Sequence, residues 1–213
     1  MLILLFVNSV VKKKIRGSNH VHTRERVPME KLKTAKVLLL DADGVWFTGF
    51  ETRGVLPSGE SLVLKSRHHH DGQGLSFLRA IGMRVVFVSG EGEPLQSIVK
   101  KLNELPSAKS GAWMPVEVFT GQLKLGDKVA SIEAWFSKNT VSWSDCIYVG
   151  DDRNDVEAMK KVGLSVCPGD ARRPAKRIAE LVLQSSGGAG AIRELAELIL
   201  DARGIDENSL PPA

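Results

Sequence analysis

Two short acidic clusters, 110 residues apart, carry the side chains best suited to chemistry. The first is Asp-Ala-Asp-Gly at 41–44, directly after the largely apolar run 36–40, and the second is Asp-Asp-Arg-Asn-Asp at 151–155, after 146–149. A buried strand that ends in carboxylates places charge at the rim of a parallel sheet, where open α/β folds bind ligands. Two such strands side by side would form a pocket of hard oxygen ligands, and such a pocket suits Mg²⁺.

Other polar residues stand at comparable places. Ser89 and Gly90 follow a further apolar run, and Lys128 opens an expected helix. Phosphoryl transfer needs a nucleophile, positive charge on the phosphoryl oxygens and a proton for the leaving oxygen. One acid of the pair Asp41 and Asp43 could attack phosphorus while the other protonates the leaving alcohol. Ser89 with the amide of Gly90 could bind a phosphoryl oxygen, and Lys128 would supply fixed positive charge.

Each of these features has a simpler structural explanation when it stands alone. An Asp-x-Asp-Gly sequence is often a turn, although an EF-hand is excluded because Val45 stands where a third oxygen ligand is required. A Ser-Gly pair commonly begins a loop, a helical lysine is usually solvated, and the second acidic cluster could cap the helix after it. The combination, in this order and after these strands, favours phosphoryl transfer instead.

The apolar pattern predicts strands that alternate with helices. The expected strands are 36–40, 84–88, 116–120, 146–149 and 164–167, and the expected helices are 72–81, 94–105, 127–136, 155–162 and 191–202. This alternation predicts an α/β fold of the Rossmann-like kind, a parallel sheet with helices on both faces. Glycine and proline between short Val/Leu stretches at 45–70 predict a β-hairpin.

Length and charge narrow the class of protein. The 213 residues suffice for one α/β domain with a buried core, and 43% hydrophobic and 25% charged residues are ordinary for a globular protein. The net charge of +4 is uneven, because residues 1–35 hold eight basic against two acidic side chains and the rest hold 21 against 23. The predicted domain is therefore near neutral, which argues against nucleic-acid binding.

Both ends of the chain are predicted to lie outside the domain. Residues 1–7 are apolar, but they are too few to span a membrane, and the basic residues follow them instead of preceding them as in a secretory signal. We expect a mostly disordered basic extension at 1–30, the domain at 31–204 and a loose tail at 205–213. The two cysteines show no metal or redox spacing, so we expect free thiols, a cytoplasmic location and no stable membrane insertion.

The order of the motifs resembles that of the haloacid dehalogenase-like phosphatases. As they stand here, the motifs are Asp41-x-Asp43-Gly44-Val45, Ser89-Gly90, Lys128 and Gly150-Asp151-Asp152-x-x-Asp155. From about Lys33 to Arg203 the chain is similar to one branch, the small cap-less phosphatases of 2-keto-3-deoxy sugar acid phosphates. That similarity includes Asp-Gly-Gln-Gly at 71–74, Gly-Gln at 121–122, Val-Gly-Leu-Ser-Val at 162–166 and Ser-Gly-Gly-Ala-Gly-Ala-Ile-Arg-Glu at 186–194.

The resemblance implies roles for the acidic residues. Asp41 is identified as the nucleophile and Asp43 as the general acid/base. The carboxylates of Asp41 and Asp151 and the backbone carbonyl of Asp43 would hold Mg²⁺. Asp152 and Asp155 would lie beside these ligands. The expected reaction is Mg²⁺-dependent hydrolysis of a phosphoric monoester through an aspartyl-phosphate.

The resemblance also implies how the phosphoryl group is held. Ser89, Gly90 and Lys128 would bind it. Lys124 is an alternative to Lys128, which we prefer because Asp-Lys at the start of a helix matches the family pattern.

Departures from the branch bear on the substrate. Phe-Thr-Gly at 47–49 stands where Thr-Asp-Gly is usual, so the contact that this segment makes in the branch is lost or shifted here. Ala189 replaces a common arginine, which puts in doubt a substrate contact made by that segment. Glu91 stands where many octulosonate enzymes have arginine. Glu91 together with Trp46 is similar to the nonulosonate 9-phosphate enzymes. We therefore expect a nonulosonate 9-phosphate to be preferred slightly over 3-deoxy-manno-octulosonate 8-phosphate.

The residues between hairpin and helix are expected to reach the substrate. His70 and Asp71 would contact it together with Glu91, although a solvated or packing role is the alternative for the three adjacent histidines at 68–70, which do not by themselves make a metal site. In this cap-less family a neighbour's hairpin covers the site within a homotetramer. The hairpin expected at 49–68 would have that function here.

Two alternatives remain open from the sequence. One is a catalytically silent oligomerisation module associated with a sialic acid cytidylyltransferase, which the retained Asp41 and Asp43 disfavour. The other is a phospho-accepting receiver domain. Receivers place an acidic pair first and the phosphorylated aspartate later, and the order here is different.

Overall fold

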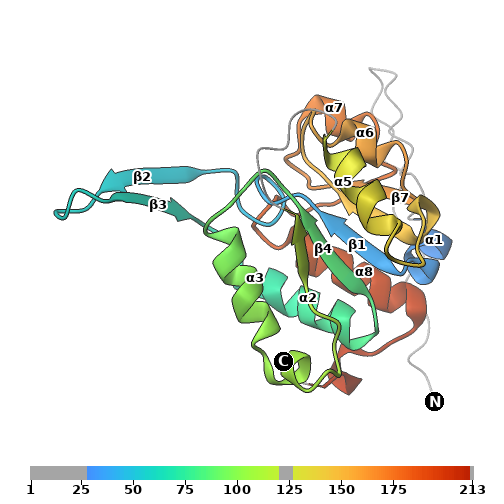
Figure 1. The fold of residues 1–213 in the computed structure, drawn as a ribbon. Helices are drawn as coiled ribbons and strands as arrows, with labels where there is room; N and C mark the ends of the chain where they lie inside the picture. Colours follow the sequence, from blue (N-terminus) through green and yellow to red (C-terminus); the bar gives the residue numbers. More distant parts are fainter. Residues whose placement is uncertain (1–27, 120–126, 212–213) are drawn as a thin grey trace, which may run out of the picture.

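A six-stranded sheet forms the centre of the protein (Figure 1). The computed structural model describes residues 28–119 and 127–211. All strand pairs of this sheet are parallel, and the strand order is β5-β4-β1-β6-β7-β8. The strands are β1 (Val37–Leu40), β4 (Arg84–Val88), β5 (Glu117–Phe119), β6 (Cys146–Val149), β7 (Leu164–Cys167) and β8 (Leu181–Val182). The predicted parallel α/β fold is confirmed.

The central strands are buried on both faces, which explains their continuous apolar sequences. In β1, Leu38 and Leu40 point into one core and Val37 and Leu39 into the other, because successive side chains alternate across a sheet. All four are 0% exposed. Both layers of the core therefore begin at β1.

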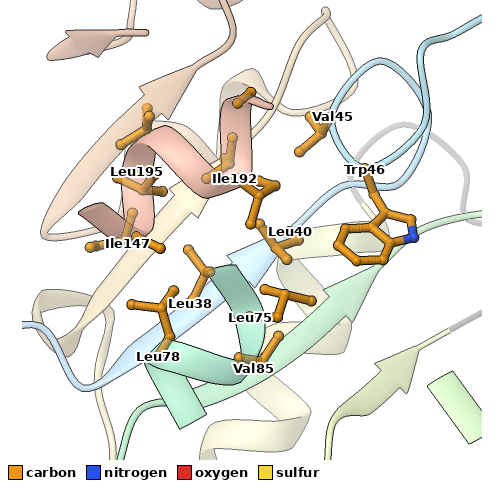
Figure 2. Packing of buried hydrophobic residues seen from close by; sticks show 14 of the residues in the cluster. Leu38, Leu40, Val45, Trp46, Leu75, Leu78, Val85, Ile147, Ile192 and Leu195 are labelled. Carbon is orange, nitrogen blue, oxygen red and sulfur yellow. The ribbon is translucent and has the colours of Figure 1, made fainter. Parts of the chain in front are cut away.

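Helices cover both faces of the sheet. One face carries α1 (Met29–Thr34), α2 (His69–Ala80), α3 (Leu95–Asn103) and α8 (Ala191–Arg203), and the other carries α5 (Asp127–Phe136), α6 (Val156–Met159) and α7 (Arg173–Lys176). Figure 2 shows Leu75 and Leu78 of α2 and Ile192 and Leu195 of α8 packed around Leu38. The remaining helix is the single turn α4 (Pro106–Lys109).

A β-hairpin projects from the body of the protein (Figure 1). Its strands β2 (Glu51–Val55) and β3 (Ser61–Lys65) are antiparallel and pair with each other in a separate sheet. Both strands are exposed as far as Lys65. The hairpin expected at 49–68 is present.

Several short elements were not predicted. They are α1, α4, α7 and β8. The predicted helix 155–162 is shorter than expected, since α6 ends at Met159. The chain must turn there to enter β7, and it passes so close to Ser144 that a Cβ on Gly163 would lie 2.4 Å from the Ser144 carbonyl oxygen.

The two ends of the domain are tied to its body. Leu32 of α1, which begins at Met29 inside the expected extension, is fully buried. The expected tail contains a 3₁₀ turn at Glu207–Ser209, and Glu207 pairs with Arg193 at 2.5 Å. Among the helices of the described residues, none has the length and apolar character that crossing a membrane requires.

Candidate active site

The acidic clusters meet at the carboxyl ends of β1 and β6. Leu40, the last residue of β1, pairs with Phe87 of β4 and with Val149 of β6, so the loops after these strands leave the sheet side by side. The N–H of Asp41 donates to the carbonyl of Val149 at 3.0 Å, which fixes the start of the first loop against the second. The sheet therefore brings residues 110 positions apart into one site.

Three carboxylates form the centre of the site. Oxygens of Asp41, Asp151 and Asp155 lie within 4.8 Å of one another. The Lys128 ammonium from the start of α5 lies 2.8 Å from Asp41 Oδ1 and 2.7 Å from Asp155 Oδ1. Lys128 is 4% exposed and Asp41 is 4% exposed, so this ion pair is shielded from water.

Asp155 has both of its oxygens in use. Its Oδ1 accepts from Lys128 and from the Tyr148 hydroxyl, both at 2.7 Å. Its Oδ2 accepts the backbone N–H of Asp151 at 2.9 Å and of Asp152 at 3.2 Å. Asp155 therefore orients the lysine and the second acidic loop, and the Tyr148 contact was not predicted.

The electrostatics of this cluster favour a cation. Burial, followed by repulsion from Asp155 and Asp41, raises the pKa of Asp151 to about 7. Burial and then Asp155 also raise the pKa of Asp41. Burial alone would lower the pKa of Lys128, but Asp41 and Asp155 outweigh it and raise that pKa. One ammonium thus faces more negative charge than it can neutralise, and a divalent cation fits this set of oxygen donors.

The carboxylate of Asp43 is not one of these three and is held by a lysine of the hairpin. Both of its oxygens accept from the Lys65 ammonium, at 2.7 and 2.9 Å. Lys65 also pairs with Glu91 Oε2 at 2.6 Å. Lys65 was not predicted as a site residue, because it lies at the end of an exposed hairpin strand and more than 20 residues along the chain from Asp43 and Glu91.

The predicted phosphate-binding serine lies at the end of β4. Ser89 is 3% exposed, and its Oγ accepts the backbone N–H of Glu91 at 3.2 Å. The N–H of Ser89 donates to the carbonyl of Phe119 in β5. Ser89 is thus fixed against β5 at the end of the strand that neighbours β1, while Gly90 is exposed.

A pocket of about 570 Å³ opens over the acidic cluster. Its acidic lining residues are Asp41, Asp43, Asp151, Asp152 and Asp170, and the others are Gly44, Thr48, Gly49, Phe50, Asn154 and Arg172. Asp170 and Arg172 were not predicted, because the loop after β7 carries no recognisable motif, and Asn154 was given no role although it lies within the second acidic cluster. Arg172 is brought there by its N–H, which donates to the carbonyl of Asp151 at 2.8 Å.

The three residues predicted to contact the substrate, Glu91, His70 and Asp71, do not line this pocket. Asp71 is 0% exposed, and its carboxylate accepts the N–H groups of Gly190 and Arg193 at the start of α8. It acts as a structural cap, because unpaired N–H groups at a helix start need an acceptor. His70 is exposed and lines a separate pocket with Gln184 and Arg193. The carboxylate of Asp71 therefore has a structural role, whereas a substrate contact of His70 stays a prediction.

Glycines allow the loops of the site to pack closely. Gly44 has φ +73°, and a Cβ there would lie 2.1 Å from Asp151 Oδ2. A Cβ on Gly187 would lie 1.8 Å from the carbonyl oxygen of Gly44, and one on Gly188 would lie 2.3 Å from the Thr48 nitrogen. The pair Gly187 and Gly188 therefore supports the loop after β1, which explains part of the 186–194 similarity.

The remaining predictions concern Trp46, Ala189, Lys124 and the Gly-Gln pair at 121–122. Ala189 is exposed beside this glycine pair. Trp46 is fully buried and packs edge-on against Phe87 at 5.4 Å, so it is a core residue. Lys124 and the Gly-Gln pair at 121–122 lie outside the described residues, so the choice between Lys124 and Lys128 rests on the observed contacts of Lys128 alone.

The chain is similar to known hydrolases. A family model of haloacid dehalogenase-like hydrolases matches residues 78–195. The 3-deoxy-D-manno-octulosonate 8-phosphate phosphatase of Salmonella typhi is 32% identical over 180 residues, which cover 84% of this chain and 87% of that protein.

Solved structures share the fold. The cobalt-bound deoxy-D-mannose-octulosonate 8-phosphate phosphatase of Haemophilus influenzae is 28% identical, with a TM-score of 0.65, and the match covers 82% of this chain and 92% of that one. The octulosonate 8-phosphate phosphatase of Moraxella catarrhalis, in complex with a magnesium ion, a phosphate ion and KDO, is 24% identical. Its TM-score is 0.68, over 83% of this chain and 91% of that one, and this likeness concerns the fold alone.

Proposed function

Since the chain belongs to the haloacid dehalogenase-like hydrolases, in the branch of the 3-deoxy-D-manno-octulosonate 8-phosphate phosphatases, we propose that it hydrolyses the phosphate monoester of a 2-keto-3-deoxy sugar acid. The observation that carries this proposal is the buried cluster of Asp41, Asp151 and Asp155 at the sheet edge, with Lys128 against two of its members. It combines a nucleophile, oxygen ligands and fixed positive charge, as phosphoryl transfer requires.

In the first step Asp41 is the nucleophile. One of its carboxylate oxygens attacks phosphorus, the bond between phosphorus and the sugar oxygen breaks, and an aspartyl-phosphate forms. Asp43 gives a proton to the leaving sugar oxygen. Lys128, 2.8 Å from Asp41, and Ser89 on the neighbouring strand stabilise the charge on the phosphoryl oxygens.

In the second step water releases the phosphate. Asp43 takes a proton from the water as its oxygen attacks phosphorus, and the bond from phosphorus to Asp41 breaks. Asp43 thereby regains the proton that it gave in the first step. Its side chain is 45% exposed and lines the pocket, so it can reach both the leaving oxygen and water.

Mg²⁺ is the metal that we propose for the site. The carboxylates of Asp41 and Asp151 and the backbone carbonyl of Asp43 would hold it, while Asp155 has no free oxygen and orients its neighbours. When bound, Mg²⁺ supplies charge that offsets the repulsion between an anionic nucleophile and an anionic phosphate. The cobalt ion in the Haemophilus influenzae phosphatase structure, at 28% identity, supports a divalent ion.

The preference for a nine-carbon over an eight-carbon sugar acid remains a prediction, and Glu91 is now its only support. Relatives such as the Salmonella typhi enzyme are named for the eight-carbon ester. We still propose a preference for a nonulosonate 9-phosphate, because a carboxylate accepts hydrogen bonds from hydroxyls that an arginine cannot accept. The value of kcat/KM should be higher for the longer ester. Glu91→Arg should shift the difference in transition-state binding free energy between the two esters by about 1–3 kcal/mol, and so narrow or reverse the preference. An unchanged ratio in competing-substrate assays would remove Glu91 from specificity.

We propose a homotetramer in which the hairpin covers a neighbour's pocket. An isolated two-stranded hairpin is marginally stable in water. This one exposes Phe50 at 82%, Val55 at 73% and Leu64 at 54%, so it has apolar surface to bury against a second copy.

Steady-state hydrolysis of a panel of sugar acid phosphates, with Mg²⁺ and with EDTA, tests the proposed function. We expect turnover of 2-keto-3-deoxy sugar acid phosphates that requires the metal. Absence of turnover on every ester would instead favour the silent oligomerisation module.

A further inference from the structure

Lys65 is the point at which the exposed hairpin enters the active site. The other residues of β2 and β3 are exposed, yet the side chain of Lys65 is 3% exposed. Its ammonium lies 2.7 and 2.9 Å from the two oxygens of Asp43 and 2.6 Å from Glu91 Oε2. It also lies 5.6 Å from the centre of the Phe47 ring.

This ammonium joins three segments of the chain. Asp43 follows β1, Glu91 follows β4, and Lys65 ends β3. Burying a charge is unfavourable unless it is paired and hydrogen-bonded, and here two carboxylates satisfy that condition while Glu51 adds a third at 3.9 Å. Burial lowers the pKa of Lys65, but its hydrogen bonds to Asp43 and Glu91 outweigh that effect, so the residue stays charged.

Asp43 depends on this lysine for its orientation. Throughout the part of the chain that the structure describes, the Asp43 carboxylate bonds to no other side chain. The base of the hairpin is also tied to the same loop, since the Thr48 N–H donates to the carbonyl of Ser66 at 3.0 Å. Without Lys65, a side chain that is 45% exposed would lose its one fixed direction.

We propose that Lys65 is a positioning residue for the reaction. It holds the carboxylate of Asp43 at the lining of the pocket, where proton transfer to and from the substrate takes place, and it links that carboxylate to Glu91. This inference rests on the proposed role of Asp43 as general acid/base. Such catalysis depends on the donor lying within hydrogen-bond reach of the leaving oxygen.

The test compares two leaving groups. An alkyl phosphate, such as a sugar acid phosphate, needs a proton on its leaving oxygen, whereas p-nitrophenyl phosphate releases a phenolate that is stable without one. The ratio kcat/KM reports the first step alone, because water attacks only after the leaving group has departed. Lys65→Met should lower kcat/KM for the alkyl ester by about 10- to 100-fold and for the aryl ester by less than about threefold. Lys65→Arg, which keeps the charge, should restore most of the alkyl rate.

Two further variants make the comparison decisive. Lys36→Met is the control, and it should change neither rate. Lys36 is exposed, pairs with Asp145 and lies just before β1, at the end of the strand away from the active site. Asp43→Asn should show the same selective loss as Lys65→Met. Melting curves check that each variant is folded.

The outcomes separate this inference from the proposed function. Equal losses on both esters, no loss, or a faster alkyl reaction in folded Lys65→Met would overturn the role of Lys65 while wild-type phosphatase activity stands. If Asp43→Asn shows no leaving-group selectivity, the proposed acid/base is wrong, and the role of Lys65 is wrong with it. Selective loss in both variants, with rescue by Lys65→Arg, supports the proposal.

Discussion

Asp41 is buried against Lys128, and replacing its carboxylate by an amide tests its chemical role separately from its role in the fold. Asp41→Asn should lower hydrolysis of the best substrate by about a thousandfold or more, because an amide oxygen does not attack phosphorus. The fold should survive, since the change also removes repulsion with Asp155. Steady-state rates and a melting curve on the same preparation check this. Hydrolysis near the wild-type rate would exclude Asp41 as the nucleophile.

The raised pKa values of Asp41 and Asp151 predict how pH and metal act together. A carboxyl whose pKa is higher in the folded state binds more protons when folded, so the metal-free protein should lose stability as pH rises from about 4 to about 7. Mg²⁺ binds the deprotonated form, so its stabilisation should grow over the same range. At pH 7.5 and saturating Mg²⁺ we expect Tm to rise by about 5 °C or more, and at pH 5 by much less.

Differential scanning fluorimetry with and without Mg²⁺ measures this effect. Asp151→Asn should remove most of the shift at pH 7.5. Asp201→Asn, at an exposed position on α8, is the matched control and should keep it. A shift of equal size at pH 5 and 7.5 would show that these carboxyls do not bind the metal.

At the scale of elements, the hairpin predicts a change of assembly. Leu64→Asp places a charge on exposed apolar surface in β3, and it should reduce the particle mass in light scattering and lower kcat/KM together. Met114→Asp, at a residue that is 48% exposed in a loop, should do neither. A fully active wild-type monomer at assay concentration would contradict the predicted role of the hairpin.

Elements marked by an apolar run or by helical spacing could be predicted from the sequence, and elements without such a pattern could not. β1, β4 and β6 are continuous apolar runs that end in polar residues, and this pattern gave both the fold and the acids of the site. α7 and β8 have four and two residues, too few for a periodic pattern, and they form because neighbouring segments fix them. Arg172, brought to the pocket just before α7, was therefore missed.

Polar contacts between residues far apart in the chain also could not be predicted from the sequence. Asp71 is part of a motif and was therefore expected at the substrate, but its partners in α8 lie about 120 residues later. Lys65 has no local pattern that marks it as buried. A motif predicts the residue type, whereas the partner of a carboxylate depends on the assembled fold.

At the scale of the whole molecule, one close contact ties the end of the domain to its beginning. Gly187→Ala should lower the free energy of unfolding by about 1–3 kcal/mol and reduce activity, because the new Cβ would lie 1.8 Å from the carbonyl oxygen of Gly44. Gly92→Ala adds a Cβ with no atom within 4 Å and should leave stability nearly unchanged. Urea titrations compare the two, and equal stability would show that the loops can separate freely.

The contact between Gly187 and Gly44 also determines when, during translation, the active site can be completed. A ribosome delivers Asp41 early and Gly187 more than 140 residues later. At about 5–20 residues per second, the nucleophile waits about 7–30 s for the segment that supports its loop. The second acidic loop also arrives during that interval. A nascent chain therefore carries an incomplete site until Gly187 has been translated, and a fragment released before that point should hydrolyse no phosphate ester.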